Sequence, residues 1–407
     1  MTVLAKELCA FVYGEAPQYS YITGLSAGGR QTLNYIRLYP KDYDGAWDSH
    51  AANPWHALFI SCAWPYVVMN NEKPKILPAK FEALRNAVLK KHGCEELDYV
   101  NTAYFPEIDP YELVGIETSS SPIKGRDAEI FKKIYDGPTY SNGKKIPQCE
   151  PYTYGTRIWK DMVLELALNK DGSVERGIVM IQGDVWVTRN PDFKIEEVTY
   201  EDLNELYDRG MAEFAFCDGI PNNMDAFRDA GGKPICTAST GDGAVPPKFA
   251  VNYYNRMLQY FGDEEEMNDF FRLFLAYGGP HGIMMEGVYG EQSGKDDCWK
   301  ALMHWFEDGV APEEITTITW DSEKQGSVHV SAAKRHSFGK ILKTHETAKG
   351  RRSISSAFSM LMHQCCLSPA ADIYATLLKT ADIGQTAARA ACEGRRTMRH
   401  SEQSADI

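Results

Sequence analysis

One short motif at residues 24–28 restricts the possible fold more than any other part of the sequence. These residues read Gly-Leu-Ser-Ala-Gly, the pattern G-x-S-x-G, and they follow a β-rich segment at residues 19–25. A helix is predicted over residues 28–38, directly after the motif. A serine between glycines at a strand-to-helix junction is typical of a sharp turn that lifts the hydroxyl clear of a sheet. The motif therefore indicates an α/β protein with Ser26 as a candidate nucleophile, the alternative being a glycine-rich turn with a bystander serine.

The rest of the sequence alternates between strand and helix patterns on both sides of an irregular region. Beyond the motif, strands are predicted at residues 45–47, 234–238 and 270–275, and helices at residues 4–11, 225–230, 249–261 and 296–308. Such alternation is typical of a mostly parallel sheet with crossover helices. We therefore expect a discontinuous core at residues 1–70 and 206–325, with residues 71–205 as a large insertion.

Composition excludes several classes of protein. The chain has 407 residues, 43% of them hydrophobic, and a formal net charge of −13, so a nucleic-acid-binding surface is not expected. The most apolar stretch, residues 55–69, is too short to cross a membrane, and residues 1–8 lack the pattern of a signal peptide. Residues 326–407 are basic and show no clear strand, so we expect a divergent, poorly ordered tail. Compartment and oligomeric state stay open.

Two later residues complete a candidate catalytic set with Ser26. Asp242 follows the predicted strand at residues 234–238, and His281 follows the one at residues 270–275. Catalytic groups gather where parallel strands end, and the order Ser, Asp, His is the one that G-x-S-x-G hydrolases use. A serine hydroxyl needs a base to take its proton, and a histidine base needs a carboxylate to fix its tautomer. The backbone N–H of Ala27 is the candidate oxyanion donor.

Other residues compete for these roles. Asp48 follows the strand at residues 45–47 and is an alternative acid. His50 and His56 come too early in the chain for the expected order, and His304 lies on a predicted helix. Turn formation at Asp242 and a solvated loop at His281 are the structural alternatives. No zinc, phosphate-loop or dinucleotide-binding motif is present, so no cofactor is expected to be required.

With this set assembled, the sequence resembles the tannase and feruloyl esterase family of α/β-hydrolases over roughly residues 5 to 318. The matching stretches are residues 19–31, 39–45, 134–138, 225–233, 271–274 and 305–312. The resemblance implies a serine carboxylic-ester hydrolase that cleaves small esters of aromatic acids, such as feruloyl or galloyl esters, through an acyl-enzyme. It also implies that residues 71–205 form a lid that shapes the acyl pocket.

Two departures from the family concern cross-links and metal. The family carries a disulfide between a cysteine before the nucleophile and one after the histidine, where this chain has Leu25 and Gly282. The family's lid also carries a calcium loop. The stretch that resembles it offers Glu95, Asp98, Val100 and Tyr104 as candidate ligands. Thr102 stands where another carboxylate is expected, and hard cations need several oxygen ligands, so this stretch is a degenerate form of the calcium loop.

The last departure concerns the start of the chain. The family's core has strands before the nucleophile strand, whereas Ser26 here lies only 25 residues after Met1. We therefore expect a core that is incomplete at its N-terminal side, with an open edge on the nucleophile strand or an unusual cover over it. The first hypothesis is an active esterase, and the alternative is a catalytically impaired relic or fragment that keeps a binding cleft.

Overall fold

A mixed sheet organises the part of the chain that the computed structural model describes, which is residues 1–95, 100, 105–158, 186–190, 192–219, 224–276, 281, 298–321 and 326–334. Within these residues the strand order is β1-β2-β3-β4-β6-β5. The strands are β1 (Tyr21–Leu25), β2 (Gly45–Ser49), β3 (Lys233–Ser239), β4 (Arg272–Ala276), β5 (Glu314–Asp321) and β6 (Gly326–Lys334). β1 to β4 are parallel, whereas β6 runs antiparallel to both β4 and β5. The expected α/β fold with a mostly parallel sheet is confirmed.

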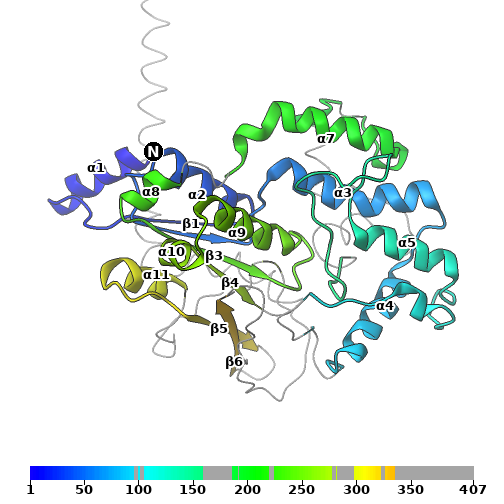
Figure 1. The fold of residues 1–407 in the computed structure, drawn as a ribbon. Helices are drawn as coiled ribbons and strands as arrows, with labels where there is room; N and C mark the ends of the chain where they lie inside the picture. Colours follow the sequence, from blue (N-terminus) through cyan, green and yellow to red (C-terminus); the bar gives the residue numbers. More distant parts are fainter. Residues whose placement is uncertain are drawn as a thin grey trace, which may run out of the picture. The chain divides into compact units, whose positions relative to one another are not determined.

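Helices cover both faces of this sheet (Figure 1). The helices near the sheet are α1 (Thr2–Tyr13), α2 (Ala27–Leu38), α8 (Asp225–Asp229), α9 (Lys248–Phe261), α10 (Glu264–Phe270) and α11 (Cys298–Glu307). Successive residues of a strand point to opposite faces. Accordingly, Ala46 and Cys236 pack in the core on the side of α2 and α9, whereas Trp47 and Ile235 pack with α11. The central strands therefore carry buried apolar residues on both faces, which is the pattern of a buried parallel sheet.

A second group of helices is inserted between β2 and β3. These elements are α3 (Trp55–Glu72), α4 (Pro78–Lys91), η1 (Pro110–Leu113), α5 (Gly125–Asp136), η3 (Ile195–Glu197), α7 (Tyr200–Phe214) and η4 (Ala215–Cys217). They gather in one part of the molecule (Figure 1) around a large apolar core that contains Phe59, Phe81 and Phe131. A buried ion pair between Lys80 and Asp127, 2.6 Å long, joins α4 to α5 inside it.

The two ends of this insertion are tied together. The side-chain amide of Asn53 donates to the carbonyl of Gly219 and accepts from its N–H, at 2.7 and 3.0 Å. Asp218 accepts a hydrogen bond of 2.8 Å from the N–H of Trp55, the first residue of α3. The amide pair is buried, and burial strengthens such bonds and makes their loss costly. The insertion is therefore anchored beside the sheet where the chain leaves it and returns.

Two predicted boundaries differ from the structure. α3 packs with α5 and α7 in the core of the insertion, so that core includes residues before residue 71 and reaches beyond residue 205. Strand β6 lies within the segment predicted as a disordered tail, and residues 326–334 belong to the sheet. The reason is pairing: β6 forms an antiparallel ladder with β5, and its own mixed sequence gives no clear strand pattern. Among the helices of the described residues, none combines the length and apolarity needed to cross a membrane.

Candidate active site

Ser26 occupies a strained turn between β1 and α2. Its backbone has φ 60° and ψ −117°, a region that non-glycine residues rarely adopt. Its N–H donates to the carbonyl of Ser49, and its own carbonyl accepts from the N–H of Ala52, each at 2.9 Å. Side chains held in such conformations cluster at active sites, where the surrounding structure compensates for the strain. The fold thus maintains a costly conformation at this serine.

The first glycine of the motif makes this turn possible. A Cβ placed on Gly24 would lie 2.2 Å from the carbonyl carbon of Gly28, closer than side chains ever approach backbone. A Cβ on Gly28, by contrast, would meet no atom within 4 Å. The strand end and the first turn of α2 are therefore in direct backbone contact. Ala27 is the first residue of α2, where backbone N–H groups lack partners within the helix.

Asp242 and His281 are brought together after β3 and β4. His281 Nδ1 lies 2.7 Å from Asp242 Oδ2, and both side chains are largely buried. The other carboxylate oxygen of Asp242 accepts from the N–H groups of Ala244 and Val245, each at 2.8 Å. These contacts fix the carboxylate on both sides, so it can hold the imidazole in one orientation.

The charge of this pair follows from its surroundings. Burial would raise the pKa of Asp242, but the charge and hydrogen bond of His281 and the N–H of Val245 together lower it below its ordinary value. Asp242 is therefore ionised at neutral pH. A buried carboxylate next to Nδ1 favours the tautomer in which Nδ1 carries the ring proton and Nε2 carries none.

A second histidine lies against this pair. His50 follows β2, is 1% exposed, and its ring packs edge-to-face on that of His281, with centroids 5.4 Å apart. Burial lowers the pKa of His50 to about 3, so this ring is neutral at physiological pH. His50 comes too early in the chain to be the expected base, so the order of residues gives it no other role. Its signal was its position directly after a buried strand, next to Ser49.

These residues share one edge of the sheet. Ser26 follows β1, His50 follows β2, Asp242 comes after β3 and His281 after β4, and the four strands are parallel and adjacent. In open α/β sheets, ligands bind outside the carboxyl ends of the strands. The direct contact is between Asp242 and His281. Ser26 joins the same edge through backbone bonds to the segment that carries His50.

The alternative candidates for the catalytic acid and base lie in other environments. Asp48 is buried, with Cys236 and the backbone of Ala51 as neighbours, and burial raises its pKa to about 7. His281 makes its carboxylate contact with Asp242 and not with this residue. His56 bonds the carbonyl of Leu206 within the insertion, at 2.8 Å. His304 is exposed on α11 and bonds Asp308.

The calcium and disulfide expectations fall largely outside the described residues. Of the candidate ligands, Glu95 is exposed and Val100 is buried, whereas Asp98 and Tyr104 are not among the described residues. Within the described part of the chain, no three His, Cys, Asp or Glu side chains are grouped so as to hold a metal ion. Gly282 also lies outside it. The described cysteines have free thiols.

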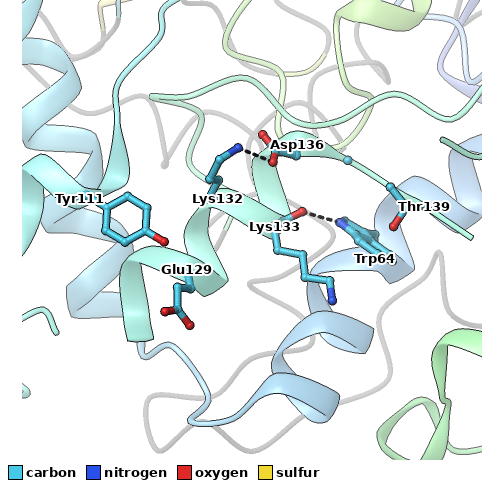
Figure 2. A pocket seen from close by; sticks show the side chains of 8 residues that line it. Trp64, Tyr111, Glu129, Lys132, Lys133, Asp136 and Thr139 are labelled. Carbon is cyan, nitrogen blue, oxygen red and sulfur yellow. Dashed lines mark hydrogen bonds and ion pairs between the residues drawn. The ribbon is translucent and has the colours of Figure 1, made fainter. Parts of the chain in front are cut away.

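A cavity of about 210 Å³ lies in the insertion, apart from the catalytic candidates. Figure 2 shows Trp64, Tyr111 and several charged side chains of α5 around it. The charges are compensated locally. Lys132 pairs with Asp136, Lys133 with Glu72, and Glu129 with Arg126. Because these groups neutralise one another and no nucleophile with a neighbouring base lines the cavity, we assign it no catalytic role.

The sheet order, the strained serine turn and the residues at the strand ends define an α/β-hydrolase fold. The sequence profile of the family described as tannase and feruloyl esterase matches residues 1–110 and 116–344. The chain therefore belongs to the tannase and feruloyl esterase family, and the resemblance noted in the sequence is confirmed.

Individual relatives agree with this assignment. "Probable feruloyl esterase" of Arthroderma benhamiae is 29% identical over 345 residues, which are 79% of this chain and 60% of the relative. "Probable feruloyl esterase B-2" of Aspergillus fumigatus is 24% identical over 343 residues, covering 77% of this chain and 61% of the relative. The chain thus spans about 60% of the length of the curated relatives it matches.

Solved structures share the fold. An esterase from Aspergillus oryzae superposes with a TM-score of 0.70 at 19% identity, over 82% of this chain and 68% of that one. Feruloyl esterase B from the same organism gives 0.67 at 17% identity, with the same coverage. Tannin acyl hydrolase from Aspergillus niger gives 0.64 at 19% identity, over 82% and 65% of the two chains. At these identities the likeness concerns the fold.

Proposed function

We propose that this protein is a serine carboxylic-ester hydrolase in which Ser26, His281 and Asp242 form a catalytic triad. The observation that carries the proposal is the buried 2.7 Å contact between Asp242 and His281, on the sheet edge where Ser26 sits in a strained turn. Family membership supports ester hydrolysis as the reaction. The alternative hypothesis is a catalytically impaired relic that binds ligands without hydrolysing them. The experiments below distinguish it from an active esterase.

In the proposed first half-reaction, His281 acts as the general base. Its Nδ1–H donates to Asp242, and its Nε2 takes the proton of the Ser26 hydroxyl as the serine oxygen attacks the ester carbonyl carbon. The negative charge that develops on the carbonyl oxygen lies at the start of α2, where the Ala27 N–H and the helix dipole stabilise it. The C–O bond of the ester then breaks, and His281 returns the proton to the leaving alcohol.

The second half-reaction repeats these steps with water. His281 takes a proton from a water molecule, the hydroxide oxygen attacks the acyl carbon, and the bond to Ser26 breaks as the serine regains its proton. Products are the free acid and the original enzyme. No metal or cofactor takes part in these steps, so treatment with a chelator is expected to leave turnover unchanged. Loss of turnover that added calcium restores would argue for a calcium-dependent lid.

We propose esters of aromatic acids as the substrate class, with feruloyl and galloyl esters as the first candidates. This choice is supported by relatives described as feruloyl esterases and by the structural likeness to a tannin acyl hydrolase. The helical insertion anchored beside the sheet edge is the proposed lid over the acyl group. Its tie at Asn53 and Gly219 keeps it next to the strand ends.

The test is hydrolysis of methyl ferulate and methyl gallate by the full chain and by Ser26→Ala. Removing a triad nucleophile lowers kcat by about 10⁴- to 10⁶-fold, because only binding and oxyanion effects stay. A fluorophosphonate probe should label the wild-type chain and leave the Ser26→Ala chain unlabelled. A variant that hydrolyses the esters at the wild-type rate removes Ser26 from the mechanism. A wild-type chain that binds ferulate without turnover or labelling supports the relic hypothesis.

A further inference from the structure

A neutral aromatic ring, His50, forms one wall of the space that His281 occupies. The two rings meet edge-to-face, with an interplanar angle of 79° and centroids 5.4 Å apart. At this distance the rings are in van der Waals contact, which is a preferred geometry for aromatic pairs. His50 is 1% exposed, so the contact also shields this side of His281 from water.

Both nitrogens of the His50 ring are occupied by serine hydroxyls. Nδ1 lies 2.8 Å from Ser49 Oγ at the end of β2, and Nε2 lies 2.7 Å from Ser239 Oγ at the end of β3. A neutral imidazole has one donor and one acceptor nitrogen, and a hydroxyl can serve either. Both ring nitrogens are therefore satisfied inside the protein, and rotation of the ring would break two buried hydrogen bonds.

The backbone of His50 is fixed as well. Its N–H donates to the carbonyl of Thr237 on β3 at 2.7 Å, and its φ is 49°, in the left-handed region. Thr237 lies beside Ser49 in the β2–β3 register. The main chain and the ring of His50 are thus both hydrogen-bonded to β3, the strand that leads to Asp242. A group tied to that strand moves with the carboxylate that orients His281.

The charge state suits a supporting role. Burial holds the pKa of His50 near 3, with a smaller opposing effect from Asp242. A ring that stays neutral cannot compete for the serine proton. It also places no like charge beside His281 when that imidazole becomes protonated during the proposed reaction, and its π system tolerates a neighbouring cation.

From these contacts we propose that His50 is a positioning residue, whose ring, clamped by Ser49 and Ser239, holds His281 in register with Asp242 and Ser26. This inference rests on the proposed hydrolase function. It assigns to His50 no contact with substrate and no proton transfer. Because a misplacement of about 1 Å in a catalytic group can cost about 10²-fold in rate, such a support has a measurable kinetic effect.

The test compares His50→Ala, His50→Phe and the control His304→Ala, which removes an exposed histidine from α11, outside the insertion. We expect His50→Ala to lower kcat by about 10- to 100-fold with little change in KM, because substrate binding is untouched. His50→Phe keeps an aromatic wall but loses both hydrogen bonds of the clamp, so it should recover only part of the loss. His304→Ala should leave kcat at the wild-type value. A folded His50→Ala chain with wild-type kcat overturns the proposal.

A readout independent of turnover separates this proposal from the hydrolase proposal. Ring ¹⁵N shifts of selectively labelled histidines report the tautomer of His281. The wild-type chain should show a single Nδ1–H tautomer, and His50→Ala a mixture. Unchanged His281 shifts in His50→Ala overturn the inference even if the wild-type chain hydrolyses esters. An inactive wild-type chain with the expected shifts would leave the positioning role supported and the hydrolase function rejected.

If His50→Ala does not fold, Ser239→Ala provides the same test with a smaller change. It removes one hydroxyl from the clamp and leaves both rings in place. We expect a smaller loss of kcat in the same direction, together with a partial loss of the single His281 tautomer. Wild-type values in both measurements would show that the clamp does not position His281.

Discussion

The proposed nucleophile and its two proposed partners are supported by very different parts of the sheet. β1, which leads to Ser26, pairs only with β2 among the described strands, and all its residues are partly exposed. β4, which leads to His281, is buried at every residue, and β3 at all but its first. Ser26 is therefore placed by local backbone geometry, whereas Asp242 and His281 are placed by a buried interior. We call β1 with Ser26 the exposed half of the site, and β3 and β4 with Asp242 and His281 the buried half. Different kinds of substitution should impair the two halves.

Among the substitutions that test this comparison, the largest effect is expected in the buried half, from Asp242→Asn. Asparagine keeps an oxygen for the N–H groups of Ala244 and Val245, so the loop should keep its shape. It presents an NH₂ group to His281, which favours the wrong imidazole tautomer and is expected to lower kcat by about 10⁴-fold. Steady-state kinetics and thermal unfolding check this together. A stable variant with near wild-type turnover would falsify the assignment of the acid.

In the exposed half, the most damaging substitutions should be those that disturb the backbone of the Ser26 turn. Gly24→Ala places a Cβ in the space of the Gly28 carbonyl, so the turn must open or the protein unfold. We expect a loss of more than about 3 kcal/mol in the free energy of unfolding, as for other overpacked or strained sites.

Gly28→Ala is the matched control for this substitution. Its Cβ meets no atom within 4 Å and lies in α2, where alanine is favoured over glycine by up to about 1 kcal/mol. Urea denaturation of both variants gives the comparison. Equal unfolding free energies in the two variants would show that the close approach is not maintained in solution.

In the buried half, the carboxyl group of Asp48 should make the free energy of unfolding depend on pH. Burial raises its pKa to about 7 from an ordinary value near 4, so the folded state keeps a proton that the unfolded state loses. A group whose pKa is higher in the folded than in the unfolded state stabilises the folded state at low pH. This stabilisation is lost as the pH rises through 7. Between pH 5 and pH 8 the wild-type chain should lose about 2–3 kcal/mol relative to Asp48→Asn. Urea denaturation at both pH values measures the difference.

An exposed carboxylate provides the control for that experiment. Asp192→Asn removes the same charge at the surface of the insertion, and its unfolding free energy should track the wild-type value at both pH values. If Asp48→Asn also tracks the wild type, the buried carboxyl is not a source of pH-dependent stability.

The smallest effect is expected from a side chain on the exposed half. The hydroxyl of Tyr21 donates to Glu307 at 2.6 Å on the surface, while its ring contacts Trp299 and Phe306. Tyr21→Phe removes the hydrogen bond and keeps the ring. We expect a loss of about 1 kcal/mol or less in the free energy of unfolding. A loss of several kcal/mol would mean that β1 depends on side-chain contacts as strongly as β4 does.

Local patterns in the sequence predicted most of this sheet. The segment at residues 19–25 contains β1, residues 234–238 lie within β3, and the expected helices at residues 28–38 and 249–261 coincide closely with α2 and α9. The contact of Asp242 with His281 also follows from sequence logic, because both residues come after parallel strands whose carboxyl ends must meet. These features depend on periodicity and order along the chain.

Features that depend on pairing across the sheet were not predicted. β6 lies in the segment predicted to be tail, because its mixed composition gives no clear strand pattern and it joins the sheet by pairing with β4, about 60 residues earlier, as well as with β5. The role of His50 depends on the register of β2 with β3, which brings Ser239 to its ring. Nothing local to residue 50 reveals that register. Such contacts become visible only when the strands are aligned.

The insertion between β2 and β3 has a consequence for the order of folding. These strands are neighbours in the sheet, yet residues 50–232 separate them along the chain. Pairing over so long a segment carries a large entropic cost and slows folding. The helices of the insertion, whose contacts are more local, should therefore form before the sheet edge is assembled. After dilution from denaturant, recovery of the proposed ester hydrolysis should lag behind recovery of the helical circular dichroism signal.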